Sequence, residues 1–175
     1  IRGGYPRDGI AEIYRLHGDS LHEKHAFESA LAVYSKTVEF ELPLEPSYVI
    51  QKFLESNKIG LIACYLQKLH EKGVAEKEHT MLLLQCYTKL KDKAALEAFV
   101  RQDQLHYDVS IAIKTLEECG YAELASDLAL RSGSKEEFVR IHLEHFAETM
   151  KVLNFIRELN ATEAVPVLMT HGRAL

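Results

Sequence analysis

The stretch between residues 47 and 165 contains no proline, and this feature constrains the fold more than any other. The four prolines lie at positions 6, 43, 46 and 166. Proline removes a backbone donor and interrupts helices and central strands alike. Within the proline-free stretch, apolar residues recur at spacings of three and four, which is the period of a helix buried along one face. The sequence therefore predicts an all-helical chain, and no comparably long alternating pattern predicts a strand.

Five apolar stripes carry this prediction. They are Ile62, Tyr65, Leu66 and Leu69; Leu83, Cys86, Tyr87 and Leu90; Val109, Ala112, Ile113 and Leu116; Tyr121, Leu124, Ala125 and Leu128; and Val152, Phe155, Ile156 and Leu159. The predicted helices cover residues 10–24, 26–38, 46–56, 59–72, 78–91, 93–102, 108–119, 121–132, 135–145, 147–159 and 163–172.

Glycine and proline predict where several of these helices end and begin. Gly73, Gly120 and Gly133 each follow an apolar stripe, where a helix end favours a left-handed residue. Pro46 suits a first helical turn, because the amide it lacks has no partner there.

Two further helix starts are predicted from capping residues. Ser134 and Glu137 have the spacing of a capping box. Thr162 is predicted to cap the last helix. Pro166 would then occupy the fourth helical position, at the edge of the turn whose amides lack partners.

Taken in pairs, the predicted helices begin near residues 10, 46, 78, 108, 135 and 163. A period of about 30 residues with short loops is typical of an α-solenoid built from antiparallel hairpins. We therefore expect a flexible segment over residues 1–9, followed by a single solenoid fragment of five to six helix pairs over residues 10–175. Because the chain opens on Ile1 without an initiator methionine, we interpret it as a piece of a longer protein.

The first pair also carries the residue pattern of a tetratricopeptide unit. Small residues at Gly18 and Ala30 would let two helices approach closely, and Tyr14, Leu21 and Tyr34 would fill the space around that contact. The later pairs lack this signature and are predicted to be generic helical hairpins.

Composition narrows the possible functions. The net charge is −5, whereas a protein that binds nucleic acid electrostatically is usually basic, so we expect no nucleic-acid partner. The longest apolar run, residues 59–66, is much shorter than the roughly 20 residues that a membrane-spanning helix needs. The three cysteines, Cys64, Cys86 and Cys119, are interpreted as reduced core thiols in a cytosolic protein.

No residue pattern predicts a catalytic, cofactor or metal site. His22 with His25, and His142 with His145, are spaced so that each pair could share a metal, but neither pair has an obvious third or fourth ligand. No cysteine–histidine pair or glycine-rich phosphate loop is evident. We therefore predict that the chain is not an enzyme and holds no cofactor, and its interaction residues stay unassigned.

Three weaker sequence patterns each have a simpler structural explanation. Residues 160–162 match a glycosylation acceptor, but Thr162 is better explained as a helix cap. The charged run 89–93 could dock an acidic partner, although it falls in an inter-helix turn where charge is usual. The tyrosines could form a stacking platform, but most lie on or beside the apolar stripes: Tyr48, Tyr65, Tyr87 and Tyr121.

The order of residues in the middle of the chain resembles the family of vacuolar protein sorting-associated protein 11, of the Pep-five type. The resemblance extends over residues 10–172 and is strongest in residues 45–50, 52–54, 65–67, 69–70, 79–80, 82–84, 86–92, 108–109, 112–114, 116 and 120–121.

This resemblance implies a clathrin heavy chain repeat region from a core subunit shared by the HOPS and CORVET tethering complexes. The implied function is a structural scaffold in vesicle fusion between endosomes and lysosomes or vacuoles. The implied partners are the other class C subunits and, indirectly through the complex, Rab GTPases and SNAREs. The implied location is cytoplasmic and peripheral on those membranes. Family members normally carry an N-terminal β-propeller and a C-terminal RING zinc domain, and neither is present here.

The sequence leaves two other functions open. One is a tetratricopeptide-like adaptor that binds a short peptide in a concave groove, with a vesicle-coat solenoid as its variant. The other is an enzyme that uses histidine and cysteine. We also expect the helices near residues 10–24 and 163–175 to expose apolar surface, which would allow weak self-association.

Overall fold

The computed structural model describes residues 6–102 and 107–173, and these residues contain eleven α-helices, one π-helical turn and no strand. The chain divides into two compact units, of which the first ends at Lys91 and the second begins at Asp92. The all-helical prediction is therefore confirmed. Whether the two units continue one solenoid, as the sequence predicts, stays a prediction.

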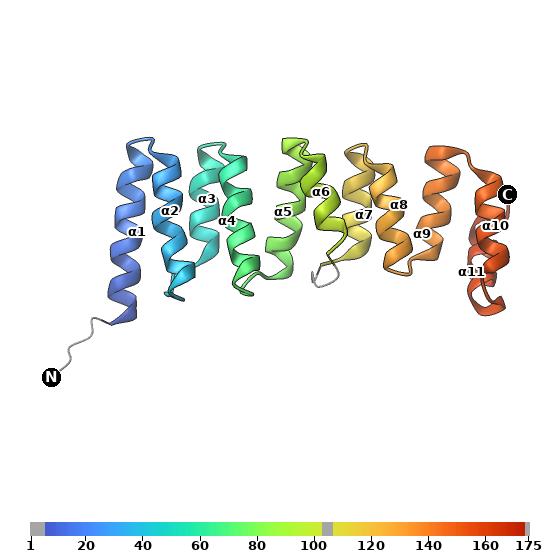
Figure 1. The fold of residues 1–175 in the computed structure, drawn as a ribbon, viewed down its shortest axis with the longest axis horizontal. Coiled ribbons are helices and arrows are strands. Elements are labelled where there is room, and N and C mark those ends of the chain that lie inside the picture. The colour runs from blue at the N-terminus through green and yellow to red at the C-terminus, as the bar shows by residue number, and fades with distance from the viewer. Residues whose placement is uncertain (1–5, 103–106, 174–175) are drawn as a thin grey trace. The chain divides into compact units, whose positions relative to one another are not determined.

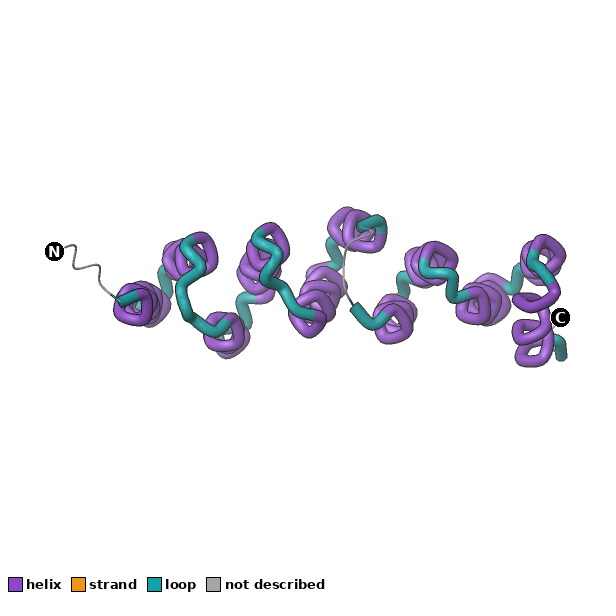
Figure 2. Tube along the Cα trace, turned by 90° about the horizontal axis from the view of Figure 1, so that it is seen from below, coloured by secondary structure: helices purple, strands orange, loops and turns teal. Residues whose placement is uncertain are grey.

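The first unit contains five helices in sequence order: α1 (Arg7–Glu23), α2 (Phe27–Glu39), α3 (Pro46–Glu55), α4 (Ile59–Glu71) and α5 (Lys77–Leu90). Helix α1 packs against α2, and α4 packs against α2, α3 and α5. Successive helices run antiparallel (Figure 1), and within this unit they alternate between two rows (Figure 2). The first helices of successive pairs therefore share one row, as expected for stacked hairpins.

The second unit contains α6 (Lys93–Val100), α7 (Val109–Glu118), α8 (Ala122–Arg131), α9 (Lys135–Ile141), the π-helical turn η1 (His142–Phe146), α10 (Thr149–Glu158) and α11 (Ala161–His171). Helix α8 packs against α6, α7 and α9, and α9 also packs against α11. Hairpins that pack mainly on their neighbours give a core along the row of helices.

The core of each unit includes many residues of the predicted apolar stripes. Ile62, Tyr65, Leu66 and Leu69 of α4 are all buried, and so are Ala112, Ile113 and Leu116 of α7. The stripe residue Leu90 and the cysteine Cys119 are instead exposed. Leu90 is the last residue of α5, and Cys119 directly follows α7. Their prediction as core residues was therefore wrong.

The close helix contact predicted for the first pair is present. A Cβ atom added to Gly18 would lie 2.3 Å from a ring carbon of Tyr34, and real Cβ atoms do not approach other atoms so closely. Ala30 and Tyr34 are fully buried on the facing side of α2. Only glycine at position 18 allows α1 and α2 this spacing.

Glycine ends three helices as predicted. Gly73, Gly120 and Gly133 have φ values of 68°, 82° and 75°. In each case the residue after the glycine donates its amide to a carbonyl inside the helix, as Val74 does to Leu69 at 3.0 Å. The same left-handed conformation occurs without glycine at five positions: His25, Glu41, Asn57, Lys91 and Ala147.

The N-terminal boundary of the first helix differs from the prediction. Helix α1 begins at Arg7, so it includes part of the segment that was expected to be flexible. Pro6 directly precedes the helix, and residues 1–5 lie outside the described residues. Pro46 occupies the first turn of α3, as predicted.

The caps of the last helices also differ. Asn160, not Thr162, caps α11, because its side-chain oxygen accepts the Glu163 amide at 3.0 Å. Pro166 consequently lies later inside α11 than predicted. Ser134 precedes α9 but its side chain makes no capping bond, and Glu137 binds Arg140 instead.

The predicted helix over residues 135–145 is interrupted. After Ile141 the chain widens into the π-helical turn η1, and Ala147 then adopts a left-handed conformation with φ of 53°. Such turns are rare and often accompany functional positions. Nothing in the apolar spacing marks this change.

No helix among the described residues is long and apolar enough to cross a membrane.

Candidate functional site: surfaces and side-chain networks

A hydrogen-bond network around Asp19 joins the first three helices. The Asp19 carboxylate accepts the Tyr34 hydroxyl at 2.6 Å and the Tyr48 hydroxyl at 2.8 Å, and it pairs with Arg15 at 2.9 Å. Arg15 also lies over the Tyr48 ring, 5.5 Å from its centroid. Because the residues come from α1, α2 and α3, the network fixes how the first two hairpins pack.

Burial and the Asp19 carboxylate both act on Tyr34. They raise its pKa, burial being the larger cause, so the hydroxyl stays protonated and donates to Asp19. Tyr48 is therefore part of a structural network. No sequence pattern indicates the pairing of Tyr48 with Asp19, because the two residues lie 29 positions apart.

His22 also holds two hairpins of the first unit together. Its Nε2 donates to the Lys52 carbonyl at 3.1 Å and lies 2.8 Å from the Ser56 hydroxyl. The ring packs edge-on against Phe27 and Phe53. The Nε2 atom is thus engaged by α3.

In the second unit, Arg140 of α9 lies among three carboxylates. It pairs with Glu117 at 2.6 Å, Glu137 at 2.6 Å and Glu144 at 2.8 Å. These bonds, chiefly that to Glu117, raise the pKa of Arg140. Glu137 and Glu144 have the spacing of intrahelical ion pairs with Arg140, so these two ion pairs could have been predicted from the sequence. Glu117 reaches it from α7.

Three groups beside Arg140 could each offer one ligand atom to a metal. The atoms of Glu117, Glu144 and His145 lie within 4.8 Å of one another. However, Arg140 already forms ion pairs with both carboxylates, and His145 lies 2.9 Å from Glu117. The chemistry of this set is that of an ion-pair network, so we assign no metal to it.

His142 of η1 lies at the centre of a second chain of hydrogen bonds. Its Nδ1 is 2.9 Å from a Glu148 oxygen, and its Nε2 is 2.8 Å from the Ser126 hydroxyl. Since a carboxylate can only accept, Nδ1 carries the proton and Nε2 accepts from Ser126 when the ring is neutral. Burial lowers the pKa of His142, with Lys151 adding to the effect and Glu148 opposing it.

The order serine, histidine, carboxylate is also that of a hydrolase triad, and the sequence analysis missed it. Here Ser126 is buried within α8. The amides of α8 around it are engaged in the helix, so they cannot act as oxyanion donors. The chain of bonds therefore serves as a packing contact between α8 and η1.

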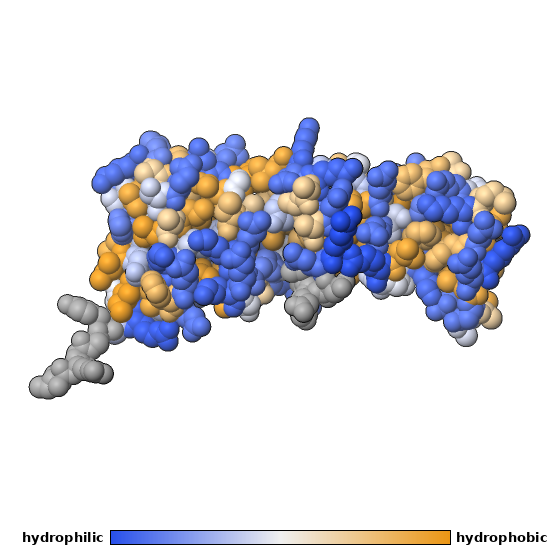
Figure 3. All heavy atoms as spheres, viewed as in Figure 1, coloured by the Kyte–Doolittle hydropathy of each residue, from blue (hydrophilic) through white to orange (hydrophobic). Residues whose placement is uncertain are grey.

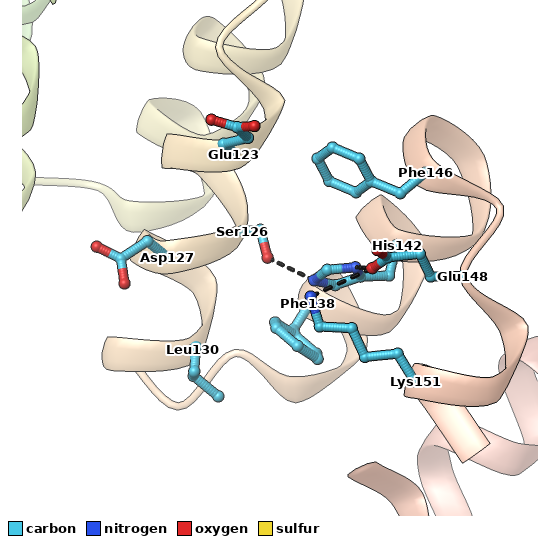
Figure 4. A pocket seen from close by; sticks show the side chains of 9 residues that line it. All are labelled: Glu123, Ser126, Asp127, Leu130, Phe138, His142, Phe146, Glu148 and Lys151. Atoms are coloured by element: carbon cyan, nitrogen blue, oxygen red, sulfur yellow. Dashed lines mark hydrogen bonds and ion pairs between the residues drawn. The ribbon is translucent and has the colours of Figure 1, made fainter. Parts of the chain in front are cut away.

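A cleft of about 390 Å³ lies beside His142 in the second unit. It is bounded by α8 on one side and by α9, η1 and the start of α10 on the other (Figure 4). Its lining comprises Glu123, Ser126, Asp127, Leu130, Phe138, His142, Phe146, Glu148 and Lys151.

The structure does not bring the predicted histidine pairs together on a metal. His142 and His145 bind different acidic residues, Glu148 and Glu117. His22 bonds to α3, whereas His25 has a left-handed backbone and packs on Phe27.

The cysteines divide between core and surface. Cys86 is buried, and burial raises the pKa of its thiol to about 11, so it is unreactive near neutral pH. Cys64 and Cys119 are exposed, which corrects their interpretation as core thiols. Tyr65 is fully buried and Tyr87 nearly so, consistent with tyrosines on the core stripes.

The charged run 89–93 and the polar run 160–162 both lie at the ends of helices. Lys89, Lys91 and Lys93 are exposed where α5 ends and α6 begins. Asn160 and Thr162 bond to each other at the start of α11, through the Thr162 hydroxyl and the Asn160 oxygen at 2.6 Å.

Antiparallel hairpins that pack in sequence, with polar networks joining one hairpin to the next, define a helical-repeat protein. Residues 22–175 match the PEP5/VPS11 clathrin repeat, and the chain belongs to this family. The resemblance seen in the sequence is thereby confirmed.

Several curated proteins are similar over almost the whole chain. A vacuolar protein sorting-associated protein 11 homolog of Dictyostelium discoideum is 40% identical over 171 residues, which is 98% of this chain and 18% of that protein. The Homo sapiens homolog is 38% identical over 171 residues, or 96% of this chain and 18% of that protein. A RING finger protein of Plasmodium falciparum is 29% identical over 172 residues, or 98% and 13% respectively.

The chain thus spans about a fifth of the length of the first two relatives. No solved structure matches it.

Proposed function

We propose that this chain is a structural scaffold segment of a membrane-tethering subunit, acting through protein–protein interaction in fusion between endosomes and lysosomes or vacuoles. The observation that carries the proposal is the stack of hairpins in each unit, together with membership of the PEP5/VPS11 clathrin repeat family. Hairpins packed on their neighbours leave long exposed faces for partners.

The side-chain networks support the same role. The Asp19, Arg140 and His142 networks each join separate helices, so they hold the exposed faces in fixed positions. A binding surface needs such preorganisation, because ordering loops or side chains on association costs free energy.

The proposed partners are the other class C subunits of the HOPS and CORVET complexes. Rab GTPases and SNAREs would be engaged only through the assembled complex. The proposed location is the cytoplasmic face of endosomes and lysosomes or vacuoles, peripheral and through the complex. The segment is proposed to have no catalytic role of its own.

A pull-down tests this proposal. The chain, immobilised, is expected to retain one or more purified class C subunits from a defined mixture. Two charge-reversed variants then locate the surface: Lys72→Glu with Lys89→Glu in the first unit, and Lys114→Glu with Arg157→Glu in the second. These side chains are exposed. Retention of none of the subunits by the unmodified chain would contradict the proposal.

A further inference from the structure

The cleft beside His142 combines aromatic rings with carboxylates that have no partner among the described residues. Its volume of about 390 Å³ falls within the range of small-molecule sites. Its lining residues belong to α8, α9, η1 and α10, apart from Glu148, which directly precedes α10. It is therefore formed entirely within one compact unit.

The unpartnered carboxylates are those of Glu123 and Asp127. They lie one turn apart on α8 and are exposed. Among the described residues, neither side chain has a hydrogen bond or an ion pair. The third carboxylate of the lining, Glu148, is already engaged by His142 at 2.9 Å and Lys151 at 3.2 Å.

The charge of the lining is consequently negative. The lining carries three carboxylates and one ammonium group, and burial keeps His142 neutral near neutral pH by lowering its pKa. Negative potential in a recess attracts a cation more strongly than the same charges would on a convex surface.

The opposite wall of the cleft is aromatic. Phe146 lies across the opening from Glu123, and its ring projects toward the gap (Figure 4). Phe138 packs against His142 with ring centroids 4.4 Å apart, and the exposed Leu130 lies at the lower edge in the same view. An aromatic face beside carboxylates is the environment that a guanidinium group prefers.

We propose that this cleft binds an arginine side chain presented by a partner protein. The guanidinium would pair with Glu123 or Asp127 and lie against the Phe146 ring, while its aliphatic stem would cover Leu130. The inference rests on the proposed scaffold function, and it adds the chemistry of one partner contact.

The test uses the intact chain and three short peptides: acetyl-Leu-Arg-Leu-amide, the same peptide with citrulline in place of arginine, and the same peptide with glutamate. Citrulline has nearly the shape of arginine but no charge. Backbone amide shifts of the isotope-labelled chain are followed by NMR during each titration. The arginine peptide is expected to shift residues 123–130 and 142–151, and to bind about tenfold more tightly than the citrulline peptide.

A matched pair of variants separates the site from general charge. Glu123→Gln with Asp127→Asn should weaken arginine-peptide binding by about tenfold. Glu118→Gln with Glu136→Gln removes the same charge from exposed positions outside the cleft and should leave binding unchanged. Phe146→Leu should weaken binding while leaving the carboxylates in place. Helical content measured by circular dichroism confirms that each variant is folded.

Any of three results would overturn the proposal. The arginine and citrulline peptides could bind equally, the two double variants could bind the arginine peptide equally, or the amide shifts could be confined to other residues. The outcome is independent of the pull-down. Retention of class C subunits without peptide binding would leave the scaffold function standing and remove only this contact. Loss of subunit retention would remove the scaffold function whatever the peptides do.

Discussion

Single residues set the spacing of the first two helices. Gly18 is required where the Tyr34 ring approaches α1, and Tyr34 cannot retreat because it is fully buried and bonded to Asp19. The sequence pattern predicted this close contact correctly, since large and small residues alternated at helical spacing. It could not predict Asp19 as the partner of Tyr34 and Tyr48, because that contact depends on how three helices pack.

Gly18→Ala is therefore expected to destabilise the chain. A Cβ atom would overlap the Tyr34 ring, and overpacking of this kind costs about 2 kcal/mol, more than alanine gains in helix propensity. The free energy of unfolding by urea measures the change. Gly60→Ala in α4 is the control, because nothing lies within 4 Å of its added Cβ, and it should be neutral or slightly stabilising. Equal effects at both positions would contradict the close-packing account.

His142 predicts a dependence of stability on pH. Burial lowers its pKa in the folded chain, so the unfolded state binds more protons as the pH falls below the ordinary value of 6.5. The contribution of His142 is therefore complete above that pH and is lost as the pH falls below it. The melting temperature should decline over this range.

The variant His142→Gln should flatten that decline, since glutamine does not titrate. His17→Gln is the comparison, because His17 is exposed on α1. His70 also has its pKa lowered by burial, so part of the dependence should remain in the variant. An unchanged slope in His142→Gln would show that this histidine is accessible to protons in the folded chain.

At the scale of elements, helix type and helix ends were predictable to different degrees. Each α-helix of the described residues overlaps a predicted one, and long apolar stripes located α4, α5, α7, α8 and α10, because burial on one face is a property of many residues together. The ends depend on single hydrogen bonds, which explains why Asn160 rather than Thr162 caps α11. The π-helical turn at His142–Phe146 was not predicted, because its wider winding leaves no signal in apolar spacing.

Ala147 follows that turn with φ of 53°, a conformation that costs a residue with a Cβ atom about 1 kcal/mol. Ala147→Gly should therefore raise the free energy of unfolding by about this amount. Ala98→Gly, in the exposed face of α6, should lower it by about 1 kcal/mol because glycine is a poor helix former. Urea unfolding measures the change in the free energy of unfolding for both substitutions. Changes of opposite sign would confirm the left-handed end of η1, and changes of equal sign would contradict it.

At the scale of the whole molecule, apolar side chains remain exposed on the first and last helices, as the sequence predicted. Ile13 and Leu16 of α1 are more than half exposed, and apolar surface along α1 is visible in Figure 3. On α11, Met169 is 83% exposed and lies near the exposed Val165 and Leu168. Exposed apolar stripes favour association between copies of a chain.

We therefore expect weak self-association that depends on these stripes. Ile13→Lys with Met169→Lys should shift the sedimentation profile toward the monomer at high protein concentration. Ile111→Lys is the control, because Ile111 of α7 is similarly exposed but lies on neither terminal helix. A strictly monomeric unmodified chain, or equal effects of the two sets of substitutions, would contradict this expectation.

The central claim is that the chain works by presenting preformed helical faces to partner subunits. Hydrogen exchange of the chain, measured by mass spectrometry with and without a saturating class C subunit, tests it most directly. The account predicts slower exchange in a contiguous set of helices on one face of a unit, with the buried core segments 62–69 and 112–116 unchanged. Exchange that is unaltered throughout both units, or protection that appears only through ordering of the cores, would contradict it.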